Sequence, residues 1–260
     1  MGQPTDYELY LRVPELLALQ KKPGELACHD ELLFQVVHQA AELWMKLVAH
    51  DLALAGSLIS AARLTEAAKT LRRTHQVLGL LSQSLETLYT LSPLDYMRIR
   101  EVLGRGSGQE SPGYRRLLAL PGQIFPHFEA LLEQQALSLF QVYSKPGQHP
   151  EFFQIAEALL EFDLRLQEWR NRHILLVYRT IGVGTPSLKG KHSELLEKSL
   201  RQQFSRSFGR SATNCFHPGA WRTRRARPRR WPRRRRPIPR LPRTDPMSRR
   251  DSLREDVRRA

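Results

Sequence analysis

Apolar residues recur at helical spacing through most of the chain, whereas sustained alternation of apolar and polar residues is almost absent. A period of three to four residues is typical of amphipathic helices, and alternation is typical of half-buried strands. The pattern therefore predicts an all-α fold built as a helical bundle. The expected helices span about residues 30–55, 64–88, 93–103, 123–143, 150–181 and 193–204.

Several of these segments end at residues that stop or start helices. Ser92 and Pro93 open one segment, and Gly56 and Gly182 close two others. Proline is accepted in the first turn of a helix, and glycine is common just after the last turn. Within residues 64–88, leucines recur every seven residues from Leu64 to Leu85. This spacing predicts a seam that packs against another helix.

Two of the expected helices carry a histidine on their apolar face. His38 lies four residues after Phe34, and His173 lies four residues after Trp169 and seven after Leu166. A buried histidine needs a hydrogen-bond partner or must be neutral. Each residue on its own is explained as a satisfied core histidine. Two of them on separate core helices also suit a pocket for a metal cofactor, since neutral imidazole is a common axial ligand of haem iron.

The charge of the chain is concentrated in its last 56 residues. Residues 205–260 contain 19 arginines, no lysine and four acidic residues, so they carry the whole net charge of +15 and leave residues 1–204 neutral. Such an Arg/Pro-rich segment is expected to be disordered. Two domains are therefore predicted: a helical body over 1–204 and a tail over 205–260.

Cysteine content and the N-terminal sequence narrow the class of protein further. The only cysteines are Cys28 and Cys215, which excludes a disulfide scaffold, a cysteine-based zinc site and a c-type haem attachment. No apolar run reaches the roughly 18 residues that a membrane helix needs. The first residues lack the basic and apolar regions of a signal peptide. A cytoplasmic protein without a membrane partner is expected.

The segment His29–Leu52, HDELLFQVVHQAAELWMKLVAHDL, resembles the tryptophan 2,3-dioxygenase family. Further segments resemble the family in the same order along the chain. They are YELYL at 7–11 with LLALQ at 16–20, SPLDYMRIREVLGRGSGQES at 92–111, EWRNRHILLVYRTIG at 168–182, and Gly184-Thr185. Because these segments span most of residues 1–190, the resemblance implies that residues 1–204 form an all-α bundle enclosing a b-type haem.

The resemblance also implies roles for individual residues. His173, in the WRNRH segment, would be the axial ligand of the haem iron, with the opposite face open to dioxygen. His38, on another helix, would act as the distal base that accepts a hydrogen bond from the indole N–H. Phe34, one turn earlier, would wall the indole ring.

The remaining implied residues would hold the amino-acid end of the substrate and complete the pocket. Arg100 and Tyr96 lie four apart on one helix face and would bind the carboxylate. Thr185 would meet the ammonium group. Tyr7, Tyr10 and Leu11 would line the pocket of a neighbouring subunit, which implies a homotetramer with a shared active site.

The implied activity is the cleavage of the indole C2–C3 bond of L-tryptophan by dioxygen, which gives N-formylkynurenine in tryptophan catabolism. Three departures from the family concern substrate recognition: a shorter stretch between Arg100 and His173, Pro186 to Lys189 after Thr185, and no aromatic residue in SGQES at 107–111. A haem-dependent monooxygenase of tryptophan or tyrosine derivatives is therefore an alternative. A different class, a helical nucleic-acid-binding protein that uses its basic tail, is a further alternative.

The tail also suggests a shifted reading frame. The family leads us to expect Phe-Phe-Pro-Glu-Leu-Trp from Phe204, but the chain reads Phe-Ser-Arg-Ser-Phe-Gly up to Gly209. Deleting one T from TTC TTC CCG GAG CTT TGG turns the first peptide into the second. Abundant arginine and proline are also what GC-rich coding DNA yields out of frame. The alternative is a genuine basic tail.

Overall fold

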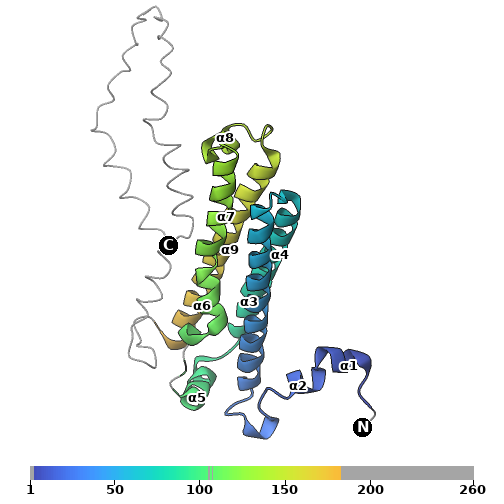
Figure 1. Ribbon diagram of the computed structural model, residues 1–260. Coiled ribbons are helices and arrows are strands. Elements are labelled where there is room, and N and C mark those ends of the chain that lie inside the picture. The colour runs from blue at the N-terminus through green and yellow to red at the C-terminus, as the bar shows by residue number, and fades with distance from the viewer. Residues whose placement is uncertain (1–2, 105, 107, 183–260) are drawn as a thin grey trace, which may run out of the picture. The chain divides into compact units, whose positions relative to one another are not determined.

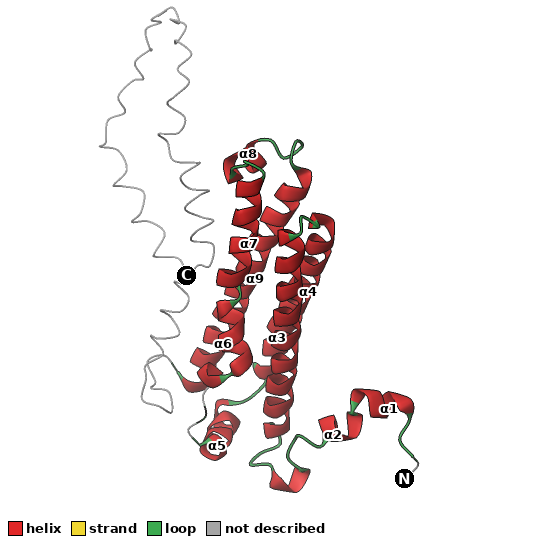
Figure 2. Cartoon of the chain, viewed as in Figure 1, coloured by secondary structure: helices red, strands yellow, loops and turns green. Residues whose placement is uncertain are grey.

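The computed structural model describes residues 3–104, 106 and 108–182, apart from the side chain of Gln109. Every regular element in this part of the chain is helical, which confirms the predicted all-α fold (Figures 1 and 2). The α-helices are α1 (Asp6–Leu11), α2 (Val13–Leu17), α3 (Glu31–Ser60), α4 (Leu64–Leu88), α5 (Pro93–Leu103), α6 (Pro112–Ala119), α7 (Pro121–Gln134), α8 (Leu139–Ser144) and α9 (Pro150–Ile181). Two short 3₁₀ turns, η1 (Pro23–Glu25) and η2 (Gly108–Glu110), join them.

Four long helices, α3, α4, α7 and α9, run side by side and enclose the core (Figure 1). Helix α3 packs against α4 and α7, and α4 packs against α9. The core is made mostly of leucine, alanine, isoleucine, valine and phenylalanine side chains from these helices. One carboxylate is also fully buried, that of Asp51 on α3. It accepts two hydrogen bonds from the Arg73 guanidinium of α4, at 2.6 and 2.5 Å. A buried carboxylate of this kind needs such a partner.

The predicted leucine seam and several predicted helix ends agree with the structure. Helix α4 spans the predicted residues and buries the leucines of the seam. Ser92 caps α5, because its hydroxyl accepts a hydrogen bond from the Asp95 amide at 3.0 Å. Helix α9 ends at Gly182, which has a positive φ of 86°. The sequence therefore places α4, α5 and α9 correctly.

Gly56 does not end its helix, contrary to the sequence prediction. Helix α3 continues to Ser60 through this glycine. A Cβ atom at position 56 would lie 2.8 Å from Cδ2 of His127 on α7. The imidazole of His127 also hydrogen-bonds the Ser60 hydroxyl at 2.7 Å. Gly56 thus permits close packing of α3 and α7, and this tertiary contact is not visible in the sequence period.

The stretch predicted as a single helix over 123–143 is divided in two. Helix α7 ends at Gln134, and α8 begins at Leu139 after Ser138, whose hydroxyl accepts a hydrogen bond from the Gln141 amide. Between them Ala136 has a positive φ of 49°. Helix α6 was not among the helices expected from the sequence either. Ser111 caps it, accepting a hydrogen bond from the Tyr114 amide at 2.9 Å.

The N-terminal arm, which we define as residues 3–20 with α1 and α2, differs from the bundle. Neither of its helices has a buried residue. The chain just after the arm is held on α3 by polar contacts. Lys21 donates to Glu31 and to the Gln35 side chain, and the Ala27 amide donates to Glu31 at 2.6 Å.

No helix in the described part of the chain is long and apolar enough to span a membrane. The chain divides into two compact units, Met1–Ala220 and Trp221–Ala260. The predicted helix over 193–204, the basic tail over 205–260 and Thr185 all lie outside the described residues.

Candidate functional site

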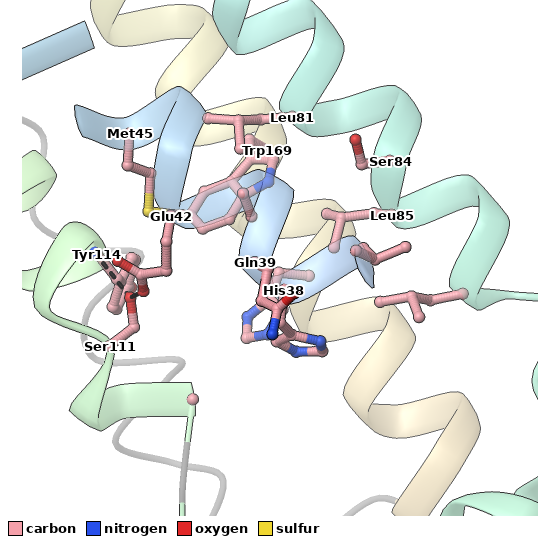
Figure 3. Close-up of a pocket in the computed structure, with 15 residues that line it drawn as sticks. His38, Gln39, Glu42, Met45, Leu81, Ser84, Leu85, Ser111, Tyr114 and Trp169 are labelled. Carbon is pink, nitrogen blue, oxygen red and sulfur yellow. Dashed lines mark hydrogen bonds between the residues drawn. The ribbon is translucent and has the colours of Figure 1, made fainter. Parts of the chain in front are cut away.

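A largely apolar cavity of about 220 Å³ opens between α3, α4, α9 and the start of α6 (Figure 3). Both histidines singled out in the sequence line it, although they belong to helices far apart along the chain. Leucine, valine and methionine side chains form most of the remaining wall. The residues from α3 are Val37, His38, Gln39, Ala41, Glu42 and Met45; those from α4 are Leu81, Ser84, Leu85 and Leu88; Trp169 and His173 come from α9.

His173 is a half-buried, neutral imidazole on α9. Its ring stacks on the indole of Trp169, one turn earlier, with the ring centroids 5.8 Å apart and the planes inclined by 9°. Burial and the nearby charge of His38 lower the pKa of His173 to about 4. A neutral imidazole has a free lone pair at neutral pH, which is the form that binds a metal ion.

His38 is exposed at the edge of the same cavity and is held by its own helix. Its Nδ1 atom lies 2.7 Å from the carbonyl oxygen of Phe34, one turn earlier. A carbonyl can only accept, so Nδ1 carries the proton and, in the neutral ring, Nε2 has the free lone pair. The crowding of the ring by neighbouring atoms lowers the pKa of His38, although the Phe34 carbonyl and the Glu42 carboxylate oppose this shift.

Phe34 and Tyr96 join His38 to form an aromatic edge of the site. The rings of Phe34 and His38 have centroids 4.0 Å apart, and those of Phe34 and Tyr96 are 6.4 Å apart. Tyr96 is on α5, one turn before Arg100, and both are half-buried. Burial raises the pKa of the Tyr96 phenol, while the charge of Arg100 lowers it. The structure therefore brings Phe34, His38 and Tyr96 together, with the Arg100 charge close to the phenol.

Two features of the site were not found from the sequence. Glu42, one turn after His38, points from α3 toward Ser111 and Tyr114 at the start of α6 (Figure 3). Its carboxylate accepts hydrogen bonds from the Ser111 hydroxyl and from the Gly113 amide. Trp169, whose ring also packs against Tyr114, has a buried indole N–H without a hydrogen-bond partner among the described residues. A glutamate at helical spacing from His38 was the available signal for the first feature.

The residues of the N-terminal arm do not reach the cavity of their own chain. Tyr7 and Tyr10 are 69% and 88% exposed, and Leu11 is also exposed. None of them lines the pocket. If these residues take part in a site, a second copy of the chain has to supply it.

Among the described residues, no group of three or more histidine, cysteine, aspartate and glutamate side chains could hold a metal ion by itself. A haem needs only one ligand from the protein, because the porphyrin provides four nitrogen atoms. The fold and the site thus define a class: an all-α protein in which two neutral imidazoles from separate helices share one apolar cavity.

Comparison with known proteins identifies the family within this class. The family described as "Tryptophan 2,3-dioxygenase" matches residues 1–127. The tryptophan 2,3-dioxygenase of Erythrobacter litoralis is 32% identical over 256 residues, which cover 78% of this chain and 96% of that protein. The tryptophan 2,3-dioxygenase of Caulobacter vibrioides is 33% identical over 240 residues, with 73% and 90% covered. The chain belongs to the tryptophan 2,3-dioxygenase family.

The same comparison bears on the length of the chain. The alignment with the Erythrobacter protein is 256 positions long, which is more residues than 78% of this 260-residue chain contains. Stretches of the Erythrobacter protein therefore have no counterpart here. This agrees with a shorter segment somewhere in the body, and its location between Arg100 and His173 stays a prediction.

Proposed function

We propose that this protein is a haem-dependent dioxygenase that cleaves the indole C2–C3 bond of L-tryptophan and forms N-formylkynurenine. The family relationship supports the reaction and the substrate. The observation that carries the proposal is the pair of neutral imidazoles, His38 and His173, on one apolar cavity. One can bind iron while the other stays available to the substrate.

The residues around the cavity fit a b-type haem. His173 offers one neutral nitrogen ligand, and its stacking on Trp169 fixes the plane of the imidazole ring. The apolar wall suits a porphyrin, and the unpartnered N–H of Trp169 is a buried donor that a polar group of a ligand could satisfy.

When bound, a ferrous haem supplies the site at which dioxygen is activated, and both oxygen atoms enter the product. The protein positions the substrate and excludes water from it. His38 accepts the indole N–H at Nε2, because Nδ1 already donates to the Phe34 carbonyl. This hydrogen bond holds the indole ring beside Phe34.

The amino-acid end of the substrate is held from α5. The planar guanidinium of Arg100 can bind a carboxylate through two parallel hydrogen bonds, and the Tyr96 phenol can add a third. Since burial raises the pKa of Tyr96, the phenol keeps its proton and remains a donor at neutral pH. Thr185 would bind the ammonium group.

A neighbouring subunit would complete the pocket. Tyr7, Tyr10 and Leu11 are apolar side chains that their own chain leaves exposed. An exposed cluster of this kind is typical of an interface. We infer that they cover the pocket of a second copy within a homotetramer, so that each active site is shared.

The function is tested by loading the purified full-length protein with haem and supplying L-tryptophan with ¹⁸O-labelled dioxygen. We expect a Soret band, a spectral change on adding tryptophan, and N-formylkynurenine that carries both labelled atoms. A product with one labelled atom would favour the monooxygenase alternative. A protein that takes up no haem but binds nucleic acid in a salt-dependent manner would favour the other class.

A further inference from the structure

Glu42 links the helix of His38 to the start of α6. Its side chain lines the cavity, one turn after His38 on α3. One carboxylate oxygen accepts the Ser111 hydroxyl, and the other accepts the Gly113 amide at 3.0 Å. Each oxygen is thus used by a different donor of the same short segment.

The contact acts as a cap supplied by another helix. Gly113 is the second residue of α6, so its amide has no acceptor within that helix. Ser111 precedes α6 and satisfies the Tyr114 amide with the same hydroxyl that donates to Glu42. A negative charge is favourable at a helix N-terminus, where the peptide dipoles point their positive ends.

Gly113 makes this close approach possible. A Cβ atom at this position would lie 2.5 Å from a Glu42 carboxylate oxygen and 3.0 Å from two atoms of Met45. Any side chain would therefore push the carboxylate away from the Gly113 amide. The glycine and the glutamate form one structural unit with Ser111, which we call the α6 clamp (Glu42, Ser111 and Gly113).

The clamp lies at the end of the segment that leads out of α5. This segment starts after Leu103, passes η2 and reaches Ser111, and both Gly108 and Ser111 line the cavity. At its other end, α5 bears Tyr96 and Arg100. α5 makes few contacts with the bundle, whereas α6 packs closely on α3. The clamp therefore attaches the start of α6 to the helix that bears His38.

We propose that Glu42 is a positioning residue that holds the start of α6, and the cavity wall formed by Ser111 and Tyr114, at the distance from His38 that the bound amino acid requires. This inference rests on the proposed function, because it assumes that tryptophan binds in this cavity. It assigns Glu42 no contact with the substrate. Its effect should be on substrate affinity and not on haem ligation.

Variants of the full-length protein test the clamp by steady-state kinetics. We expect Glu42→Gln to raise KM for L-tryptophan by roughly tenfold, since hydrogen bonds to charged groups are worth more than neutral ones. The kcat should stay within about twofold and the Soret band should not move, because the variant changes positioning and not chemistry. Gly113→Ala should raise KM similarly by displacing the carboxylate while Glu42 itself is kept.

Two further variants separate the clamp from a general loss of stability. The double variant Glu42→Gln/Ser111→Ala should be little worse than the more affected single variant, because both remove one interaction. Glu157→Gln is the matched control. Glu157 also accepts a hydroxyl hydrogen bond between two helices, from Tyr143 at 2.8 Å, but it lies away from the cavity. Its KM should equal that of the wild type.

The outcomes separate this inference from the proposed function. An unchanged KM in Glu42→Gln, or a fall in kcat with constant KM, would overturn the positioning role. So would loss of haem in this variant. If the wild type does not oxidise tryptophan, the proposed function fails. The clamp is then tested separately, by the rate of amide hydrogen exchange in the substrate-free protein. Faster exchange at residues 108–116 in Glu42→Gln, but not in Glu157→Gln, would support it, and equal exchange would reject it.

Discussion

The helical bundle and the N-terminal arm place similar side chains in opposite environments. In the bundle, α3, α4, α7 and α9 bury many of their leucines and phenylalanines against one another. In the arm, α1 and α2 carry tyrosines and leucines too, but they bury none of them. The contrast is largest between Phe162 of α9, which is fully buried, and Tyr10 of α1, which is 88% exposed.

This difference separates a region that buries its own apolar side chains from one that leaves them exposed. Burying a large apolar side chain is worth about 1.5–3 kcal/mol, and the arm leaves this gain unrealised in a single chain. Polar contacts between residues 19–31 and α3, including the Gln20–Gln39 pair, attach the arm to the bundle. The cavity that His38 and His173 line is therefore built within one chain, whereas the arm leaves its large apolar side chains exposed.

The largest effect is expected for the ligand built into the bundle. His173→Ala should abolish the Soret band of the haem-loaded protein or leave it without the signature of a nitrogen ligand. His75→Ala is the control, because His75 is also a half-buried histidine with a lowered pKa, held by the Ala158 carbonyl of α9, and it does not line the cavity. An unchanged ferrous spectrum in His173→Ala would reject this residue as the ligand.

The second prediction concerns the stability of the bundle. Phe162→Ala should lower the free energy of unfolding by about 3–5 kcal/mol, because it leaves a cavity in a closely packed core. Leu164→Ala, two residues away on the same helix, should cost less than about 0.5 kcal/mol, since Leu164 is exposed. Urea unfolding of both variants measures the difference. Equal losses would mean that α9 is not packed as described.

Helix α5 contacts α3 and α9 of the bundle, and Arg100 tests how precisely this helix is placed. Arg100→Lys should raise KM for tryptophan about 30-fold, a loss of roughly 2 kcal/mol, because lysine keeps the charge but loses the planar fork. Arg98→Lys is the control on the same helix, where the exposed Arg98 pairs with Asp95. A KM that barely changes in Arg100→Lys would mean that another group holds the carboxylate.

Much of the bundle could be predicted from the sequence, because helical period and cap residues are local signals. The bounds of α4, α5 and α9 follow from leucine spacing, Ser92-Pro93 and Gly182. Gly56 was misinterpreted because its role is a contact with His127, 71 positions later in the chain. The division at Ala136 and the clamp of Glu42 on α6 also depend on neighbours in space. Composition and periodicity alone could not reveal them.

The site itself depended on the family resemblance more than on the pattern. Helical spacing put His38 and His173 on apolar faces, and the structure places both on one cavity. The tail over 205–260 remains a prediction.

The arm should affect activity without affecting the stability of its own chain. Tyr10→Ser should leave the free energy of unfolding within about 0.5 kcal/mol of the wild type. It should lower kcat/KM for tryptophan roughly tenfold, because the variant removes an apolar cover from a neighbouring pocket. Co-expression with His173→Ala then tests sharing. Hybrid oligomers should regain activity, since each partner supplies what the other lacks, and no gain would confine the arm to its own subunit.

The smallest effect is expected where the arm joins the bundle, at Glu31 at the start of α3. Burial raises the pKa of this carboxyl, but hydrogen bonds from the Lys21 ammonium and the Ala27 amide outweigh it and lower the pKa below its ordinary value. A carboxyl with a lower pKa in the folded state stabilises the protein above the pKa of the unfolded chain, and this contribution disappears as the pH falls.

Glu31→Gln should therefore lower the free energy of unfolding by about 1–2 kcal/mol at pH 7. The difference from the wild type should shrink once the pH falls below about 4.3, the ordinary value for glutamate. Glu66→Gln is the control, because Glu66 forms an exposed pair with Arg63, and such pairs contribute little. Urea unfolding at several pH values measures both variants. A difference for Glu31→Gln that stays constant with pH would show that the carboxylate charge does not hold this junction, and that the arm is attached to α3 by the neutral contacts of Gln35 and Gln39 instead.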